Sequence, residues 1–225
     1  MAPEQEGRLE RTTDHGWDTR SLFVRPRTPF AFRPGQFISC LLPAGGETLI
    51  RPYSIASDPE AAECLELLLN LVPGGPGSTY LLGLGSGATV RFTGPWGTFT
   101  LDRAPAAATV FIADGTGIAP IRPMLHRALA TSCGYPLHLL YAAPRPEQLV
   151  YRAELDGLAR AHAGFTWTSV PGTALATEVE QRFVASDGDR TRHFCICGVG
   201  PVVPALRDLL RGAGYERRGV QYEKW

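Results

Sequence analysis

The sequence predicts two domains: an antiparallel β-barrel or sandwich in residues 1–103, then an α/β domain with a parallel sheet in residues 104–225. Two observations predict this division. Short apolar segments separated by Pro-Gly, Gly-Gly and Gly-Pro pairs fill the first half, which is typical of antiparallel strands. In the second half, apolar strand patterns alternate with helical patterns, which indicates a parallel sheet. The Ala/Pro segment at 102–107 is the predicted boundary.

The first half contains five predicted strands. Gly and Pro separate them at near-even spacing, which favours a barrel or a sandwich. Pro52 removes one backbone donor from the third strand, which is typical of a strand at a sheet edge. The five segments are TRSLFVRP (19–26), GQFISCLLP (35–43), TLIRPYSIAS (48–57), LELLLNLV (65–72) and ATVRFTGPWG (88–97).

The second half contains five predicted strands and four predicted helices. The first strand, AAATVFIAD (106–114), is a continuous apolar run, as expected for a strand buried on both faces. In the helix at 146–162, Leu149, Leu155 and Leu158 fall near one face. The other strands are LHLLYAA (137–143), FTWTSV (165–170), HFCICGV (193–199) and GVQYEKW (219–225); the other helices span 118–132, 174–186 and 200–214.

Composition restricts the class of partner. The 22 basic and 22 acidic side chains leave a formal net charge of zero, which favours neither nucleic acid nor a membrane as a partner. No apolar run approaches the ~20 residues that cross a bilayer, and the polar N-terminus has no signal core, so we expect a cytoplasmic protein.

Cys195 and Cys197 are expected on opposite faces of one strand. With Cys40, Cys64 and Cys133 they form no C-x-x-C pair, and no metal site is predicted.

Three loops after predicted strands contain glycine or proline: DGTGIAP (114–120), YAAPRP (141–146) and CGVGP (197–201). Ligands of open parallel sheets bind beyond the carboxyl ends of the strands, so these loops are expected along one rim. Gly115 and Gly117 permit close backbone approach, and the N–H groups that begin the next helix can bind phosphate. One Gly-x-Gly turn is equally typical of an ordinary strand-to-helix turn, but three such loops together favour a nucleotide site.

Six segments carry a resemblance to a known family, and they are RPGQF (33–37), RPYSIAS (51–57), PGGPGSTYL (73–81), GTGIAP (115–120), CGVGP (197–201) and YEKW (222–225). Each is moderately specific alone. In this order, over nearly the whole chain, they resemble the ferredoxin–NADP(H) reductase-like flavoproteins. The resemblance implies an FAD-binding antiparallel Greek-key β-barrel followed by a Rossmann-like NAD(P)-binding α/β domain, with FAD and NAD(P)H as cofactors.

In the RPYSIAS segment, the resemblance implies that three side chains share one FAD. Arg51 would pair with the pyrophosphate, because a guanidinium fork matches phosphate oxygens. Tyr53 would stack on the isoalloxazine ring, and Ser54 would place its hydroxyl near flavin N5, the atom that accepts the hydride. The structural alternatives are a solvated arginine, a core aromatic residue and a serine bonded to its own backbone.

The segment GGPGS resembles the second phosphate element of the family. Gly75 and Gly77 would allow close approach of the backbone, while Ser78 would donate its hydroxyl and N–H to the pyrophosphate. The alternative is a flexible hairpin tip. The other residues predicted to contact FAD are Pro52, Leu71 and Val72, the last two through the backbone at most.

In the second half, the resemblance places Thr116 and Gly117 at the nucleotide pyrophosphate. Cys197, followed by Gly198, matches the position beside nicotinamide C4, where a thiol packs without blocking the reacting carbon. Glu223 would lie near Ser54 and Cys197 and orient the ring or relay a proton. Trp225 would cover the second face of the flavin and move aside for the nicotinamide.

Two residues bear on the choice of nucleotide. Asp114 stands where the family has Gly, Ala or Thr, and its carboxylate would repel phosphate unless it faces elsewhere or reshapes the loop. The segment FTWTSVPG lacks the Ser-Arg pair that NADPH-preferring members use. Arg145 could bind a 2′-phosphate or the adenine face. Together these features slightly favour NADH over NADPH.

The predicted function is that of an FAD-dependent NAD(P)H oxidoreductase with Ser54, Cys197 and Glu223 as catalytic residues. A hydride passes to flavin N5, and electrons then go to a separate acceptor such as ferredoxin, flavodoxin or an oxygenase component. The alternatives are a free-flavin or ferric reductase, an electron-transfer subunit of a larger complex, and a domain that keeps the fold without binding flavin.

Overall fold

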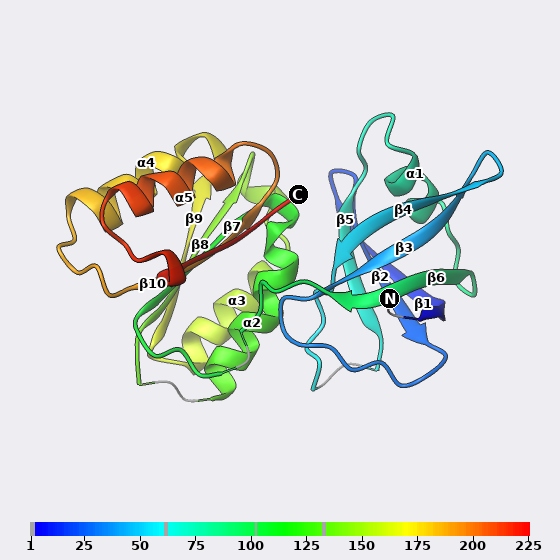
Figure 1. Cartoon of the computed structure of the whole chain (residues 1–225), viewed down its shortest axis with the longest axis horizontal. Coiled ribbons are helices and arrows are strands. Elements are labelled where there is room, and N and C mark those ends of the chain that lie inside the picture. Colours follow the sequence, from blue (N-terminus) through cyan, green and yellow to red (C-terminus); the bar gives the residue numbers. More distant parts are fainter. Residues whose placement is uncertain (1–2, 61–62, 102, 132–133) are drawn as a thin grey trace.

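The computed structural model describes residues 3–60, 63–101, 103–131 and 134–225 and contains two sheets, one in each half of the chain (Figure 1). Asp102, in the predicted boundary segment, and Cys133 lie outside the described residues. The division at 103/104 stays a prediction.

The first sheet has six antiparallel strands and is barrel-like. Its strand order is β4-β3-β6-β1-β2-β5, with β6 between β3 and β1 as in a Greek key. An isolated bridge pairs Ile55, the residue after β4, with Leu67 of β5, so the two ends of this strand order meet. The strands are β1 (Glu4–Gly16), β2 (Thr19–Pro26), β3 (Phe37–Ala44), β4 (Glu47–Ser54), β5 (Leu65–Asn70) and β6 (Thr89–Trp96). The predicted barrel is confirmed.

Two elements of this half differ from the prediction. β1 is a strand of 13 residues that was missed, because Gly7 and Leu9 alone are buried within an otherwise polar segment. A short helix, α1 (Pro76–Leu82), with Pro76 in its first turn, stands where no regular element is predicted. β4 is at one end of the strand order, as Pro52 predicted.

The second sheet is parallel, with strand order β11-β10-β7-β8-β9. The chain runs from β7 outwards to β9 and then returns to β10, so the order reverses between β7 and β10. In doubly wound folds the ligand crevice opens at this switch point. The strands are β7 (Thr109–Asp114), β8 (Leu137–Ala143), β9 (Phe165–Pro171), β10 (His193–Gly198) and β11 (Val220–Lys224).

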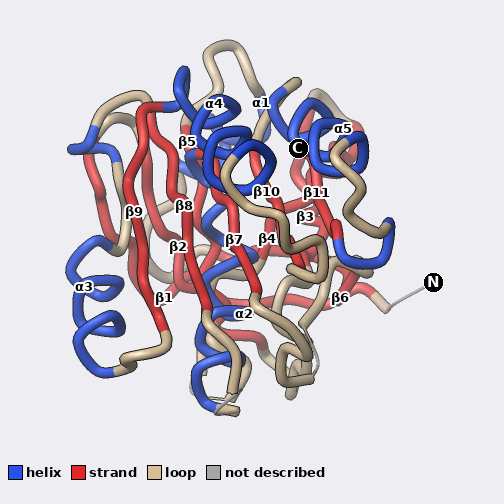
Figure 2. Tube along the Cα trace, turned by 90° about the vertical axis from the view of Figure 1, so that its left-hand side faces the viewer, coloured by secondary structure: helices blue, strands red, loops and turns tan. Residues whose placement is uncertain are grey.

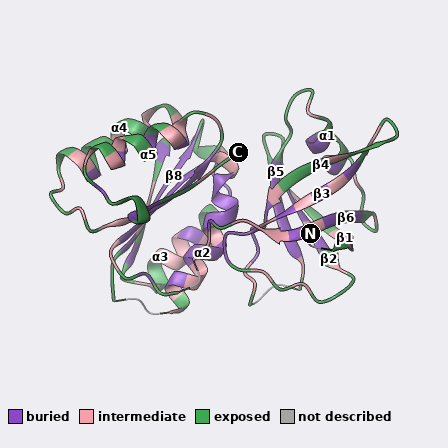
Figure 3. Cartoon of the chain, viewed as in Figure 1, coloured by how far each residue is buried: buried purple, intermediate pink, exposed green. Residues whose placement is uncertain are grey.

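Helices cover both faces of the parallel sheet, as Figure 2 shows. α2 (Ile118–Ala130) and α3 (Arg152–Ala161) pack on one face, and α4 (Leu175–Val179) and α5 (Val202–Gly212) pack on the other. α2 also faces the barrel: its buried residues share one apolar cluster with Ala56, Leu68 and Phe99 of the first half. Figure 3 shows α2 largely buried between the two halves.

Several predictions for this half are corrected. The helix expected from 146 begins at Arg152, because Tyr151 has φ +62° and Leu149 lies in the irregular segment before it. α4 ends at Val179 and continues as a π-helix, Glu180–Ala185. Cys195 and Cys197 share one face of β10, since residues two apart point the same way. In the described part of the chain, no helix has the length and apolarity needed to cross a membrane.

Candidate active site between the two sheets

The loops at the switch point bring the nucleotide residues together. Gly115–Gly117 forms a 3-10 turn after β7, and α2 begins directly after it. A Cβ at Gly117 would lie 2.2 Å from the carbonyl oxygen of Cys197 and 2.8 Å from Cα of Gly198. Residue 117 must therefore be glycine, because the backbone of β10 leaves no room for a side chain there. Thr116 lies beside it, half-buried.

Ser54 and Glu223 lie near Phe37, the first residue of β3, and Cys197 lies beside Glu223 on the parallel sheet. Phe37 is in register with Ser54 on β4, and its ring meets that of Trp225 edge-on, with centroids 5.3 Å apart at 89°. On the parallel sheet, Glu223 is in register with Cys197. The sequence thus predicted three residues that the topology does bring to one junction.

Glu223 also reaches the barrel. A Cβ at Gly97 would lie 3.7 Å from Oε1 of Glu223 and 3.1 Å from Cδ1 of Phe37. Phe37 and Gly97 are therefore neighbours of the predicted catalytic residues, and neither is among the predicted site residues. Phe37 ends the RPGQF motif, whereas Gly97 is the last residue of the predicted strand 88–97 and belongs to none of the six motifs.

Burial governs the electrostatics of this junction. It raises the pKa of Glu223 to about 7, and Oε2 of Glu223 is buried with no hydrogen-bond partner among the described residues. Burial, followed by the charge of Glu223, raises the pKa of the Cys197 thiol, while a hydrogen bond with Trp225 acts in the opposite direction. Near neutral pH the thiol is protonated, so it packs as a neutral group and is not a nucleophile.

Trp225 is held at the junction. Its N–H donates to the carbonyl of Gly198 at 3.1 Å, and its own carbonyl accepts from Gly200 at 3.2 Å. Its ring packs against the apolar cluster that contains Cys197. The terminal residue is thus tied to β10, whereas its stacking on a flavin stays a prediction.

Arg51 and Tyr53 form a second group at the start of α1. A Cβ at Gly77 would lie 2.9 Å from Cγ of Arg51 and 3.1 Å from the hydroxyl of Tyr53. Burial raises the pKa of Tyr53 to about 12, so its hydroxyl keeps its proton as a donor. Arg51 is exposed and donates to the carbonyl of Ile50 at 2.9 Å. Pro52, between them, pairs in register with Ser39.

The loop before α1 is organised by its own hydrogen bonds. Ser78 is buried; its hydroxyl accepts from the N–H of Val72 at 2.9 Å and donates to the carbonyl of Gly75 at 3.3 Å. The N–H of Leu71 donates to Asp18 at 2.8 Å. A Cβ at Gly75 would lie 2.9 Å from Cβ of Val72. The loop is thus held by hydrogen bonds within the chain. The N–H groups of Leu71 and Val72 already donate to Asp18 and Ser78.

We expect Gly77→Ala to weaken FAD binding roughly tenfold, because the new methyl group displaces Arg51 and Tyr53 by a few tenths of an ångström or more from positions that fit one ligand. Fluorescence titration of the FAD-free protein with FAD measures this. Gly85→Ala is the matched control, since nothing lies within 4 Å of its added Cβ. Equal FAD affinity of the two variants would contradict the prediction.

At the outer part of the rim, Asp114 lies under Gly198. A Cβ at Gly198 would lie 2.8 Å from Cβ of Asp114, and one at Gly172 would lie 3.8 Å from its Oδ1. Burial raises the pKa of Asp114 above its usual value. Arg145 is exposed and stacks on Trp17 of the β1–β2 turn, 4.7 Å from the ring centroid.

These residues fit FAD and a nicotinamide nucleotide. Ser54 Oγ and Glu223 Oε2 are buried polar atoms that lack a partner in the described residues, and such atoms are rare in proteins unless a ligand or water meets them. Arg51, Tyr53 and Gly77 would hold the flavin side, and Thr116, Gly117 and Cys197 the nicotinamide side.

Comparison with known proteins agrees with this fit. Residues 6–101 match the family model "Oxidoreductase FAD-binding domain", and residues 111–208 match "Oxidoreductase NAD-binding domain". Ferredoxin–NADP reductase B of Sorangium cellulosum is 34% identical, with 93% of this chain and 97% of that protein aligned. A glycine betaine monooxygenase reductase subunit of Pseudomonas aeruginosa is 29% identical over 89% of this chain, which spans 58% of that protein.

Solved structures give the same fold. The Amycolatopsis cytochrome P450 reductase GcoB superposes with a TM-score of 0.87 at 26% identity, covering 100% of this chain and 71% of that one. A ferredoxin NADP+ reductase from Neisseria gonorrhoeae with bound FAD and NADP has a TM-score of 0.84 at 20% identity, covering 100% and 99%. The chain belongs to the ferredoxin–NADP(H) reductase-like family of FAD-dependent NAD(P)H oxidoreductases.

Proposed function

We propose that this chain receives a hydride from NAD(P)H at the junction of Ser54, Cys197 and Glu223 and passes electrons to a separate acceptor: a ferredoxin, a flavodoxin or an oxygenase component. The observation that carries the proposal is that Ser54 Oγ and Glu223 Oε2, from opposite halves of the chain, are both buried and lack partners among the described residues. Bound FAD supplies the exchange between two-electron and one-electron chemistry.

The chain's own residues have distinct roles in this proposal. Ser54 donates a hydrogen bond to the reacting edge of the flavin. Cys197, with its protonated thiol, packs beside the nicotinamide and excludes water. Glu223, whose pKa is raised to about 7 by burial, can hold or release a proton near neutral pH. Trp225 covers the junction from the end of β11 until the nucleotide displaces it.

The separate acceptor is supported by relatives that are reductase subunits of oxygenases, such as the glycine betaine monooxygenase reductase subunit. A cytoplasmic location stays a prediction of the sequence.

Purified protein tests the proposal directly. We expect a flavin absorption spectrum that survives gel filtration, bleaching on addition of NADH or NADPH, and reduction of an added ferredoxin. Rates with the two nucleotides, measured side by side, establish which is preferred. A colourless protein that binds no added FAD would refute the proposal, and FAD lost on the column but consumed in turnover would favour a free-flavin reductase.

We expect Ser54→Ala to keep FAD bound and to slow flavin reduction about tenfold, because one hydrogen bond of about 1.4 kcal/mol is lost at the reacting edge. In the FAD-free protein the same change removes an unsatisfied buried hydroxyl, so the free energy of unfolding should rise by about 1 kcal/mol. Stopped-flow reduction and urea unfolding measure the two effects. Ser86→Ala, at an exposed serine, is the control. An unchanged reduction rate in Ser54→Ala would remove Ser54 from the mechanism.

A further inference from the structure

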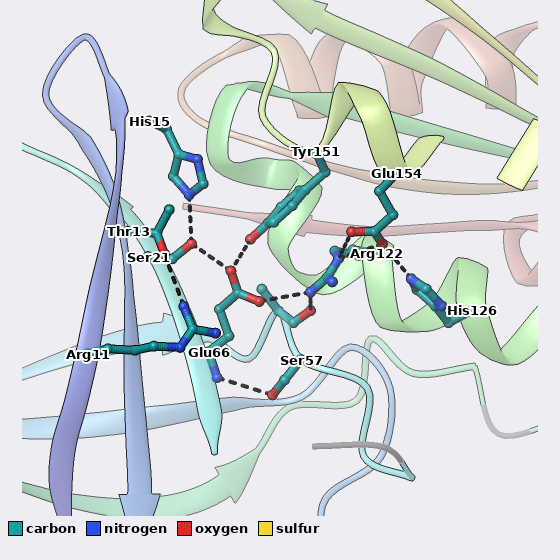
Figure 4. A network of polar contacts seen from close by, with 11 residues as sticks. Arg11, Thr13, His15, Ser21, Ser57, Glu66, Arg122, His126, Tyr151 and Glu154 are labelled. Carbon is teal, nitrogen blue, oxygen red and sulfur yellow. Dashed lines mark hydrogen bonds and ion pairs between the residues drawn. The ribbon is translucent and has the colours of Figure 1, made fainter. Parts of the chain in front are cut away.

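A buried polar network, drawn in Figure 4, connects the two halves of the chain away from the residues assigned to the cofactors. Its centre is Glu66 of β5, whose side chain is 6% exposed. Glu66 accepts hydrogen bonds from the hydroxyl of Ser21 at 2.6 Å and from that of Tyr151 at 2.8 Å, and it pairs with Arg122 at 2.8 Å. Ser21 belongs to the barrel, whereas Tyr151 and Arg122 belong to the α/β half.

Arg122, on α2, contacts three elements at once. Its Nη1 donates to Glu66 and, at 2.7 Å, to the carbonyl of Ala56 in the barrel half. Its Nε donates to both carboxylate oxygens of Glu154 on α3, at 2.8 and 3.1 Å. The guanidinium carbon lies 4.5 Å from the ring centroid of Tyr151. A charge that is 19% exposed and bonded in this way fixes the position of its helix, because no other orientation meets the same partners.

Tyr151 adopts a backbone conformation that a residue with a Cβ rarely takes. Its φ is +62°, in the left-handed region, and α3 begins immediately after it. Non-glycine residues keep this conformation where surrounding contacts over-determine it. Here those contacts are the hydroxyl bond to Glu66, the guanidinium of Arg122, and the ring of His15, whose centroid is 5.9 Å away. The strained backbone at Tyr151 is therefore held by contacts with both halves of the chain: Glu66 and His15 of the barrel half and Arg122 of the α/β half.

The network reaches both sides of the candidate active site through rigid backbone. On the barrel side, Arg122 holds Ala56, two residues after Ser54, and the N–H of Ala56 donates to the carbonyl of Glu66 at 2.8 Å. On the other side, α2 carries Arg122 and directly follows Gly117, which packs on the backbone of Cys197. One helix thus spans from the Cys197 edge of the site to the strand end that presents Ser54.

We propose that Arg122 and Glu66 are positioning residues that set the distance and angle between the Ser54 edge of the barrel and the Cys197 edge of the parallel sheet. Neither residue belongs to the group that fits the cofactors. The consequence for hydride transfer rests on the proposed function, whereas the coupling of the two edges is a property of the chain itself. A small misplacement of two reacting rings costs rate far more than it costs binding.

Three substitutions test the proposal: Arg122→Met, Arg122→Lys and Glu66→Gln. The control is Arg127→Met. Arg127 is on the same helix and also pairs across the halves, with Glu60, but this pair is 35% and 66% exposed and contributes little. In the FAD-free protein we expect amide hydrogen exchange in residues 54–57 and 115–121 to accelerate about tenfold in Arg122→Met and to be unchanged in Arg127→Met. Glu66→Gln keeps one acceptor oxygen, for Ser21 and Tyr151, but places an NH2 group where the other oxygen accepts from Arg122. Its exchange rates should lie between those of Arg122→Met and Arg127→Met.

In FAD-loaded protein, stopped-flow reduction at saturating NADH or NADPH should be at least about tenfold slower in Arg122→Met, with the ratio of FAD to protein unchanged and the nucleotide KM within about threefold. Arg122→Lys should recover part of the rate. If Arg122→Met does not fold, Arg122→Lys and Glu66→Gln carry the same comparison.

Exchange that accelerates only next to residue 122, or a reduction rate equal to that of Arg127→Met, would overturn the proposal. If the unaltered protein is not reduced by either nucleotide, the proposed function fails, while the exchange measurement still decides whether the two edges are coupled.

Discussion

Replacing Gly117 by alanine is expected to abolish reduction of the flavin by NAD(P)H and to lower the free energy of unfolding by roughly 3 kcal/mol. The added Cβ would lie 2.2 Å from the oxygen and 2.5 Å from the carbon of the Cys197 carbonyl. Backbone of a central strand cannot move away as a flexible side chain can, so the start of α2 must shift. That shift displaces the N–H groups of the 115–117 turn, which are expected to meet the nucleotide phosphates.

The two halves should respond differently to this substitution. FAD is expected to remain bound, because Arg51, Tyr53 and Gly77 lie on the barrel. Absorbance of the bound flavin, titration with NADH and urea unfolding measure the three effects. Gly212→Ala, at the end of α5 with nothing within 4 Å of the added Cβ, controls for the loss of a glycine. Equal stability and equal nucleotide binding in the two variants would show that α2 does not pack on β10 as described.

Local pattern was enough to predict most strands. β2 and β8 have the predicted bounds because each is a strongly apolar segment bounded by Gly, Pro or polar residues. β1 could not be found in the same way, since its alternation is weak and its place depends on pairing with β2 and β6. The break before α3 was hidden for a different reason. Nothing in the residues around Tyr151 demands φ +62°; the contacts that hold it come from Glu66 and His15, far away in sequence.

The candidate site shows the same limit. Arg51, Ser54, Cys197 and Glu223 were recognised from short motifs, and parallel pairing of β10 with β11 places the last two together. The contact between Phe37 and Trp225 joins residues from the two halves of the chain, far apart in sequence, which no local pattern encodes. The motifs also leave a second cause unseen: a Cβ at Gly75 would meet Val72 and one at Gly117 would meet the backbone of Cys197, while the ligand role of both glycines stays a prediction.

Glu223→Gln should raise the free energy of unfolding of the FAD-free protein above pH 7, by on the order of 3 kcal/mol at most. In the native protein, burial raises the pKa of Glu223 to about 7 from an ordinary value of 4.5. Between these two values the unfolded chain releases this proton while the folded chain keeps it, so this group lowers stability as pH rises through the window. Below pH 4.5 both states are protonated and the contribution vanishes; above pH 7 it is complete.

The same substitution is expected to slow flavin reduction or the proton release that accompanies it by on the order of 10²-fold, the size of a general acid–base contribution. A glutamine keeps the hydrogen-bonding shape but cannot exchange a proton, so the dependence of the rate on pH near 7 should disappear. Urea unfolding from pH 4 to 9 and stopped-flow reduction over the same range measure both effects. Glu47→Gln, at an exposed carboxylate at the start of β4, controls for the loss of one negative charge.

The two measurements together distinguish a functional carboxyl from a structural one. Removing a functional carboxyl raises the free energy of unfolding but slows flavin reduction. If Glu223 served folding, its removal would destabilise the protein, because a buried carboxyl that stabilises a fold is paired, as Glu154 is with Arg122. Glu223 instead keeps one oxygen buried with no partner among the described residues, which costs stability in the absence of ligand. A variant that is less stable than the wild type at pH 8, or equally fast in reduction, would place this carboxyl in the fold and leave Ser54 and Cys197 to carry the chemistry.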